Sequence, residues 1–297
     1  MSVQPRYPIY IPTRGRWQRE RALTVQCLLR DGVEFHVVVE PPEVEAYTHA
    51  VGADRVLELP FTGLGLGSIP ARNWIKDHAT AAGHARHWQL DDNMREFRRL
   101  WRGNRIPCEA GVALRVCEDF TDRYENIGVS GLNYVMFVLD RTPTPFYLNV
   151  HVYSCTLVNN AIPYRWRGRY NEDTDLCLQA LSGGWCTVLI NTFMAAKKRT
   201  MTTPGGNSDE LYTGDGRLRM ARALQQAWPH VVTVSRRYGR PQHVVNWQAF
   251  NTPLQLKPGV DLAALPPVDE YGLNLNEVKA IKSPALQQWV HDNPLPD

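Results

Sequence analysis

The alternation of short strand-like runs with helical patterns over residues 1–100 constrains the fold of this chain more than any other feature. Runs rich in β-branched and aromatic residues predict strands at 7–11, 35–39, 55–59 and 87–90. Amphipathic patterns between these runs predict helices, the first of them over 16–31, and each strand ends in a polar or glycine-rich turn. This order is typical of βαβ units, in which helices cover a parallel sheet.

The middle of the chain departs from a purely parallel arrangement. Strand-like runs at 133–139 and 148–158 follow one another without a crossover helix, which is the spacing of a hairpin or meander. A helix at 171–181 with Asn171 as its N-cap and a strand at 185–190 come next. We therefore expect an α/β fold with a mixed sheet flanked by helices.

The character of the sequence changes near residue 210. Beyond it lie one predicted helix at 217–228, one basic strand-like run at 231–237 and a proline-rich tail. We expect one domain over 1–210 and a helical and basic extension over 211–297 that packs on the same domain.

Charge, hydropathy and cysteine content exclude several classes of protein. The 33 Lys and Arg residues and 30 Asp and Glu residues leave a net charge of +3, too small to indicate general attraction to nucleic acid. The longest apolar run, 150–158, is far shorter than the roughly 20 residues of a membrane span, and 1–15 lack a signal-peptide layout. The six cysteines have no C-x-x-C spacing, which favours buried free thiols. A cytoplasmic protein without a membrane anchor or an obligate protein partner is expected.

Polar side chains follow the predicted strands, and ligands of open α/β sheets bind at the carboxyl ends of strands. The residues at these ends are Thr13, Arg14, Arg16, Glu40, Asp91, Asp92 and Asn93, with a glycine-rich loop after the third strand. The ordered set, more than any single member, predicts a ligand site at this edge of the sheet.

Three residues with side-chain oxygens, Asp91, Asp92 and Asn93, come directly after the fourth predicted strand. A rigid strand end with carboxylate oxygens suits a hard divalent cation that bridges two phosphates. A solvated turn or a helix cap is the alternative for the triplet taken alone.

The glycine-rich loop, Gly63-Leu-Gly-Leu-Gly, leads into a helix whose first turn carries Arg72. Backbone N–H groups and this guanidinium are both suited to a diphosphate. The spacing is not the dinucleotide fingerprint, and the loop follows the third strand rather than the first, which argues against NAD or FAD. A plain connector with a surface arginine is the alternative.

Three carboxylates, Glu172, Asp173 and Asp175, lie in the first turn of the helix at 171–181. They suit the helix dipole whatever their function, so helix stabilisation is one interpretation. The other is catalytic, because deprotonating an acceptor hydroxyl needs a carboxylate base close to it. Glu172 and Asp175 lie three residues apart on one helix face and Asp173 points elsewhere, so different carboxylates can serve different partners.

Arginines interleaved with aromatic residues flank both acidic motifs. The members considered for nucleic-acid contact are Arg98, Arg99, Arg102, Arg165 and Arg167. Such composition suits phosphate backbones and stacked or flipped bases, whereas a solvated face with salt bridges is the common explanation for any single run.

Together these motifs resemble the GT-A glycosyltransferases and, more narrowly, the TET/JBP-associated glycosyltransferases. The resemblance is carried, in order, by Thr13-Arg14-Gly15-Arg16, Gly67-Ser-Ile-Pro-Ala-Arg72-Asn73, Leu90-Asp-Asp-Asn93 and Asn171-Glu-Asp-Thr-Asp175, and it covers about residues 5–210. It implies a GT-A-like (Rossmann-like) sheet, a UDP-sugar donor and a divalent metal, Mn²⁺ or Mg²⁺. The family is found largely in phages, and the implied acceptor is 5-hydroxymethylcytosine in double-stranded DNA.

The resemblance also implies residue roles. Thr13, Arg14, Arg16 and Glu40 would line the nucleoside pocket, Arg72 would lie near the diphosphate, and Asp91, Asp92 and Asn93 would bind metal and ribose. Glu172, Asp173 and Asp175 would meet the acceptor and the donor sugar, with Asp173 as the base. One departure is Asn93, which stands where the usual Asp-x-Asp motif has an acid, so weaker metal affinity is expected and Asp92 can take that role.

Three other functions fit parts of the sequence. The same fold could act on a protein or a cell-surface glycan, although the basic clusters near the acidic motifs favour DNA. A nucleotidyltransferase usually has a glycine-rich basic loop after the first strand, and Arg14-Gly15-Arg16 is a poor version of it. A catalytically silent DNA-binding module would bind DNA without hydrolysing a UDP-sugar.

Overall fold

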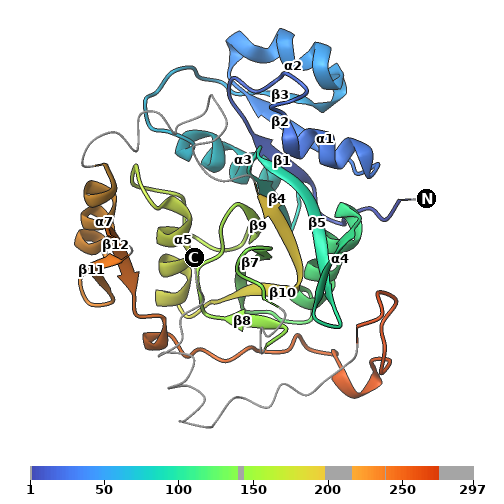
Figure 1. The fold of residues 1–297 in the computed structure, drawn as a ribbon, viewed down its shortest axis with the longest axis vertical. Helices are drawn as coiled ribbons and strands as arrows, with labels where there is room; N and C mark the ends of the chain where they lie inside the picture. Colours follow the sequence, from blue (N-terminus) through green and yellow to red (C-terminus); the bar gives the residue numbers. More distant parts are fainter. Residues whose placement is uncertain (1, 140–143, 198–215, 238, 274–297) are drawn as a thin grey trace.

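A ten-stranded mixed sheet forms the centre of the computed structural model, which describes residues 2–139, 144–197, 216–237 and 239–273. The strand order is β3-β2-β1-β4-β9-β7-β10-β5-β6, with β8 paired to β10 (Figure 1). The expected α/β fold with a mixed sheet is confirmed.

The N-terminal half is parallel, as predicted. Its elements are β1 (Ile9–Pro12), α1 (Leu23–Arg30), β2 (His36–Val39), α2 (Val44–Val51), β3 (Val56–Glu58), α3 (Ile69–Ala81) and β4 (Arg86–Leu90), with 3-10 turns at Pro41–Glu43 and Ala53–Arg55. The prediction that the first helix starts near Arg16 is wrong by about two turns. Thr13 and Arg16 bond the carboxylate of Asp92, so the chain remains a loop before α1 begins.

The second half makes the sheet mixed. Its elements are β5 (Met94–Trp101), β6 (Asn104–Cys108), α4 (Ala110–Thr121), β7 (Ile127–Tyr134), β8 (Phe146–Leu148), β9 (Cys155–Asn159), α5 (Glu172–Ser182) and β10 (Cys186–Lys197). β9 is antiparallel to β4 and β7, and β10 is parallel to β7 and antiparallel to β5.

Two strand predictions in this half are wrong, and one hairpin is missing from the predictions. The run at 148–158 is not one strand, because β8 ends at Leu148, β9 begins at Cys155, and residues 149–154 between them belong to no strand. The run at 133–139 was expected as a strand, but β7 lies earlier, because it is buried on both faces and its small residues give no alternating pattern. The β5–β6 hairpin was not predicted, because its arginines hide the alternation of a strand and suggest a charged surface instead.

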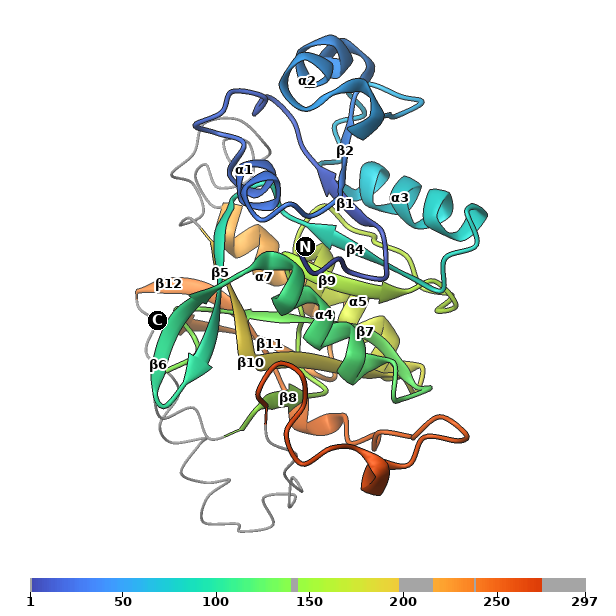
Figure 2. The same cartoon turned by 90° about the vertical axis from the view of Figure 1, so that its right-hand side faces the viewer.

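Helices cover both faces of the sheet (Figure 2). Leu28 of α1, Tyr47 of α2 and Leu114 of α4 belong to the core on one face. Ile75 of α3 and Leu176 of α5 pack on the other face. Among the described residues, no helix combines the length and apolar character that crossing a bilayer would require.

The C-terminal part adds α7 (Gly216–Ala227), the antiparallel pair β11 (Val232–Arg237) and β12 (Arg240–Val245), and 3-10 turns at Trp247–Ala249 and Leu262–Ala264. The helix and the first strand were predicted, and β12 was not. Leu224 and Val232 pack on Leu178 of α5, and Asn126 Nδ2 donates to the Pro253 carbonyl at 2.8 Å. The expected boundary near residue 210 lies outside the described residues and stays a prediction.

The adjacent strands β7 and β9 approach each other closely at Gly131, which pairs with Thr156. A Cβ at Gly131 would lie 2.1 Å from the carbonyl oxygen of Cys155. That oxygen belongs to the backbone, so it cannot move aside as a flexible side chain can. A side chain at position 131 would therefore push β9 away from β7.

Gly131→Ala should lower the free energy of unfolding by about 3 kcal/mol, at the upper end of overpacking costs. Chemical denaturation would measure the change. Gly128→Ala on the same strand is the matched control, because the atoms nearest to its Cβ would belong to the side chains of Ile162 and Trp185, both at 3.2 Å. Equal losses in the two variants would contradict this account of the β7–β9 contact.

Candidate active site

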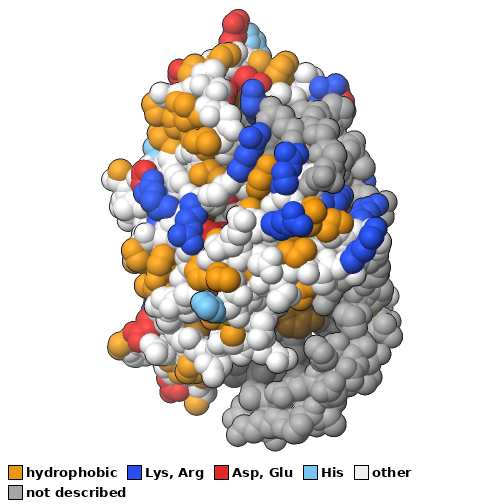
Figure 3. Space-filling view, turned by 90° about the vertical axis from the view of Figure 1, so that its left-hand side faces the viewer, with side chains coloured by type: hydrophobic (Ala, Val, Ile, Leu, Met, Phe, Trp, Pro, Cys, Tyr) orange, Lys and Arg blue, Asp and Glu red, His pale blue; other side chains and the backbone are white. Residues whose placement is uncertain are grey.

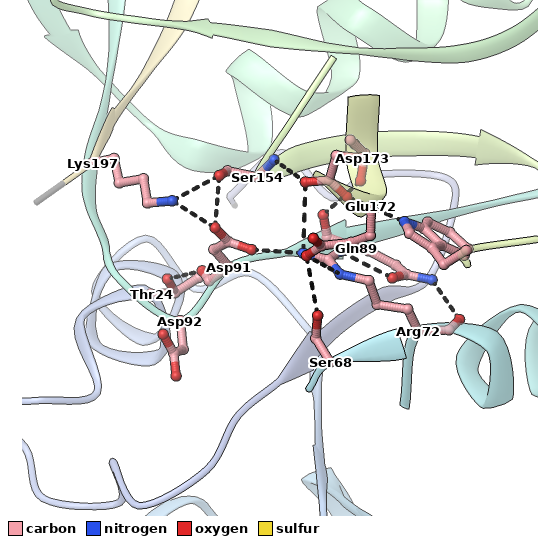
Figure 4. A network of polar contacts seen from close by, with 12 residues as sticks. Thr24, Ser68, Arg72, Gln89, Asp91, Asp92, Ser154, Glu172, Asp173 and Lys197 are labelled. Atoms are coloured by element: carbon pink, nitrogen blue, oxygen red, sulfur yellow. Dashed lines mark hydrogen bonds and ion pairs between the residues drawn. The ribbon is translucent and has the colours of Figure 1, made fainter. Parts of the chain in front are cut away.

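A buried guanidinium joins the two acidic motifs. Arg72, in the first turns of α3, is 3% exposed, and its Nη2 donates to Asp91 Oδ1 at 2.9 Å. The same Nη2 lies 3.8 Å from Asp173 Oδ2, and Nε lies 4.0 Å from Glu172 Oε1. Figure 4 shows these side chains converging from α3, the end of β4 and the start of α5.

Asp91 is bonded through both carboxylate oxygens. Oδ2 accepts from Ser154 Oγ at 2.6 Å and from Lys197 Nζ at 2.7 Å, opposite the Arg72 contact on Oδ1. Burial would raise the pKa of Asp91, but the charges of Lys197 and Arg72 outweigh burial and hold it below the usual range. Asp91 is therefore an anion fixed between two cations.

Ser154 links the two acidic motifs through its backbone and its side chain. Its hydroxyl donates to Asp91, and its N–H donates to Asp173 Oδ2 at 3.4 Å. Its φ is 64°, in the left-handed region that costs a non-glycine residue about 1 kcal/mol. Strain of this kind persists only where surrounding bonds hold it, and it is often found at functional sites.

Asp92 points away from this cluster (Figure 4). Its Oδ2 accepts from Thr13 Oγ1 at 2.9 Å, and its Oδ1 accepts from Arg16. Burial raises the pKa of Asp92. The structure thus brings Asp91, rather than Asp92, to Glu172 and Asp173.

The three carboxylates of α5 have different partners, as expected, but they group differently. Asp173 Oδ1 accepts from Trp166 Nε1 at 3.1 Å, and Glu172 Oε1 accepts from Ser68 Oγ at 3.2 Å. Both lie at Arg72, and burial raises the pKa of Glu172.

Asp175 lies among other partners. It is 4% exposed and accepts from Arg167 Nε at 2.9 Å and from Trp228 Nε1 at 2.7 Å, which ties α5 to the C-terminal elements. The prediction that Asn171 caps the helix through its side chain is wrong. Asn171 adopts φ 55°, and its Nδ2 donates to the Met220 carbonyl instead.

The residues predicted for the nucleoside pocket follow β1 and β2. Thr13 Oγ1 also bonds the Tyr47 hydroxyl at 2.8 Å, and Arg16 is 6% exposed beside Asp92. Glu40 Oε2 accepts from the N–H of Gly63 in the glycine-rich loop at 3.3 Å, and Arg14 is exposed. These side chains surround the carboxyl ends of the first two strands.

The oxygens at the end of β4 suit a divalent cation that arrives with phosphates. Within the described ranges, no group of three or more His, Cys, Asp or Glu side chains is placed to hold a metal alone. Mg²⁺ commonly needs only one or two protein carboxylates, since substrate phosphates complete its shell. Asn93 Oδ1 is buried and has no hydrogen-bond partner among the described residues, so a neutral oxygen follows Asp91 two residues along the chain.

Sequence reasoning missed Ser154 and Lys197. Lys197 ends β10, which was expected to stop at residue 190, and its Nζ donates to Asp91 and, at 2.9 Å, to Ser154 Oγ. A lysine at the end of an apolar run, Phe193 to Ala196, is the signal that could have found it, because strand ends carry ligand-binding residues. Ser154 has no comparable signal.

The predicted nucleic-acid residues divide between the faces of β5. Arg98 bonds Glu96 and the Arg105 carbonyl, whereas Arg99 lies over the rings of Trp101 and Phe193 on the opposite face. Successive strand residues alternate in direction, so Arg98 and Arg99 cannot form one patch.

The other members of the predicted set are exposed but in contact with neighbours. Arg102 lies over Trp101, Arg165 forms a two-bond ion pair with Asp77, and Arg167 pairs with Asp175. Figure 3 shows Lys and Arg side chains gathered in a band on the face that carries α7, with few acidic ones among them.

Arg72→Met should lower the free energy of unfolding at pH 7 by about 3 kcal/mol, because three partly buried carboxylates lose the cation that they share and Lys197 remains only for Asp91. A carboxyl whose pKa is depressed in the folded state, as that of Asp91 is, adds stability above its unfolded pKa of about 4, and loses it as pH falls. The difference in the free energy of unfolding between wild type and variant should therefore shrink below about pH 4. Urea unfolding across pH would measure it.

Lys76→Met is the matched control. Lys76 lies on the same helix and is 5% exposed, but its Nζ donates to the carbonyls of Ile162 and Tyr164. Its loss should not create the same acid dependence. A pH-independent gap for the Arg72 variant would contradict the proposed pairing.

Comparison with known proteins identifies the family of this chain. The family model of the TET-associated glycosyltransferases matches residues 7–206. No curated protein matches the chain. The crystal structure of a putative nucleotide-diphospho-sugar transferase from Desulfovibrio desulfuricans G20 is similar over 77% of this chain and 99% of that chain, with 11% identity and a TM-score of 0.36. Since the family model spans more than half of its length, the chain belongs to the TET-associated glycosyltransferases and is a glycosyltransferase.

Proposed function

We propose that this glycosyltransferase moves a sugar from a UDP-sugar to the hydroxymethyl group of 5-hydroxymethylcytosine in double-stranded DNA, with the help of Mn²⁺ or Mg²⁺. The observation that supports this most is the meeting of Asp91 with Glu172 and Asp173 around Arg72. It joins a strand end suited to a nucleotide with carboxylates suited to an acceptor. We further expect the enzyme to act in the cytoplasm of a phage-infected host.

The donor would occupy the carboxyl ends of β1, β2 and β4. Thr13, Arg14, Arg16 and Glu40 would surround the nucleoside, and the N–H groups of the loop at 63–67 would face the diphosphate. Arg72 is only 3% exposed, so it would not contact the diphosphate directly. It would act on the donor site by holding the carboxylates in place.

The metal would be held by Asp91 and Asn93. Asp92 is the weaker candidate, because its side chain points away from Glu172 and Asp173, whereas Asp91 shares Arg72 with them (Figure 4). A divalent cation bound with the donor supplies charge stabilisation to the departing diphosphate.

The base would be Asp173. The acceptor hydroxyl oxygen forms a bond to the anomeric carbon, the bond from that carbon to the UDP oxygen breaks, and the hydroxyl proton passes to the Asp173 carboxylate. Trp166 Nε1 orients this carboxylate through Oδ1, as a positioned base requires. Direct displacement of this kind inverts the anomeric centre.

The DNA acceptor is supported by the chemistry of the surface. Arg98, Arg102, Arg165 and Arg167 are cations at or near the surface of the same molecule, and arginine suits phosphate contacts. Arg99, packed on Phe193, is the least suited member of the predicted set. A protein or glycan acceptor would not need such cations.

Incubation of the protein with 5-hydroxymethylcytosine DNA, Mn²⁺ and a panel of UDP-sugars tests the proposal. Mass spectrometry of the released nucleosides should show one modified nucleoside heavier by one sugar. Unmodified DNA of the same sequence is the control and should gain nothing. Hydrolysis of a UDP-sugar without any increase in the mass of the DNA nucleosides would contradict the DNA acceptor and point to another one. Chelation of the divalent metal should stop sugar transfer.

Asp173→Asn should cut turnover by about a hundredfold or more while leaving donor binding intact, because it removes a positioned base. Steady-state transfer and UDP-sugar binding would measure the two effects. Asp175→Asn on the same helix is the comparison. The Asp175 carboxylate is held by Arg167 and Trp228, so Asp175→Asn should lower the melting temperature and leave turnover nearly unchanged. Loss of donor binding in Asp173→Asn would show that another carboxylate is the base.

A further inference from the structure

A cavity of about 510 Å³ borders the active site on the side of β5, β6 and β10. Its lining residues are Arg98, Arg105, Tyr134, Val135, Met136, Ala196 and Lys197. Sites for small molecules commonly have volumes of about 300–1,000 Å³, so this one is large enough for a nucleotide. Lys197 lines the cavity and also donates to Asp91, so it connects the cavity to the active site.

An irregularity in β10 places Lys197 at the edge of this cavity. Pairing of β10 with β5 shifts register between Ala196 and Lys197, and both of these consecutive residues line the cavity. Regular strand alternation would send them to opposite faces. Bulges re-aim side chains in this way and are frequent beside active sites.

Among the described residues, the lining carries three cations and no carboxylate. Arg98 is held by Glu96 through Nε and Nη2, and its Nη1 donates to the Arg105 carbonyl. Arg105 is exposed and donates Nη1 to the Val135 carbonyl at 3.0 Å, which leaves most donors of its guanidinium for a ligand. An anion with several acceptor oxygens fits this lining.

The position of the cavity favours the acceptor strand over the donor diphosphate. In the sheet, β1 and β2 lie on one side of β4, and β10, β5 and β6 lie on the other side, beyond β9 and β7. The residues suited to the nucleoside follow β1 and β2, so the donor side is opposite. Asp91 lies between the donor side and the cavity, because its Oδ1 faces Arg72 and its Oδ2 faces Lys197 (Figure 4).

We propose that this cavity binds a backbone phosphate of the acceptor DNA next to the modified nucleotide, with Arg105 and Arg98 on the phosphate oxygens and Lys197 at the end nearest Asp91. The inference rests on the proposed function for the identity of the acceptor. A phosphate held there brings the neighbouring nucleoside beside Asp91 and the carboxylates of α5. Lys197 then acts as a positioning residue between the two substrates.

Arg105→Met in the full chain tests the cavity, because Arg105 is exposed and its removal should not prevent folding. Fluorescence anisotropy with a duplex, measured over a range of salt concentrations, should show a rise in Kd of about five- to tenfold. The slope of log Kd against log salt should fall by about 1, the change expected when one phosphate contact is lost. Arg105→Lys should restore part of both effects.

Arg95→Met is the matched control. It removes the same charge from an exposed position on β5, but Arg95 does not line the cavity, so its effect on Kd should be several-fold smaller. UDP-sugar hydrolysis without DNA should be unchanged in Arg105→Met.

Two outcomes would overturn the inference. One is an unchanged Kd and salt slope in both Arg105→Met and Arg98→Met. The other is a raised KM for UDP-sugar with unaltered DNA affinity, which would give the cavity to the donor diphosphate. In both outcomes the DNA affinity is read from binding to unmodified duplex DNA, which does not depend on sugar transfer. A wild-type protein that binds DNA through Arg105 but transfers no sugar to it would therefore defeat the proposed function and leave the cavity standing.

Discussion

The ionised side chain of Arg72 is the constraint on which the rest of the site depends. A guanidinium cannot lose its proton, and burying it without partners would cost far more than a domain's net stability. Its partners, Asp91, Glu172 and Asp173, come from stretches about eighty residues apart in the sequence. The end of β4 and the start of α5 must therefore meet at α3 for the molecule to fold. Folding and assembly of the site are one event.

The same constraint explains the local strain. Ser154 and Asn171 both adopt left-handed backbone conformations directly beside the cluster, and each is bonded on more than one side. Three carboxylates and two cations, Arg72 and Lys197, leave one excess negative charge when all are ionised. A site in that state favours a cation that enters with the donor phosphates, and it resists a diphosphate that enters alone.

The sequence predicted the parallel half of the sheet and the stretches that meet, because strand ends and helix starts have local signals. It could not rank Asp91 against Asp92, since neighbours at a strand end point in different directions and only the fold shows which one faces α5. The same limit applies to Arg98 and Arg99, which look equivalent in a basic run and lie on opposite faces of β5. Ser154 depends on a left-handed backbone conformation that no residue pattern indicates, and Lys197 lies at a bulge that the apolar run before it does not reveal.

The position of Asp91 in the sheet determines from which sides two substrates can approach the site. β4 is the last strand of the parallel half and pairs with the antiparallel β9, so its end is where the sheet changes character. Open α/β sheets commonly bind ligands at such changes, because loops diverge there and leave room. Arg72 approaches Asp91 from the parallel half and Lys197 from the mixed half. A reaction that joins two substrates needs two approaches to one reacting centre, and this carboxylate, held by one cation from each half, separates them.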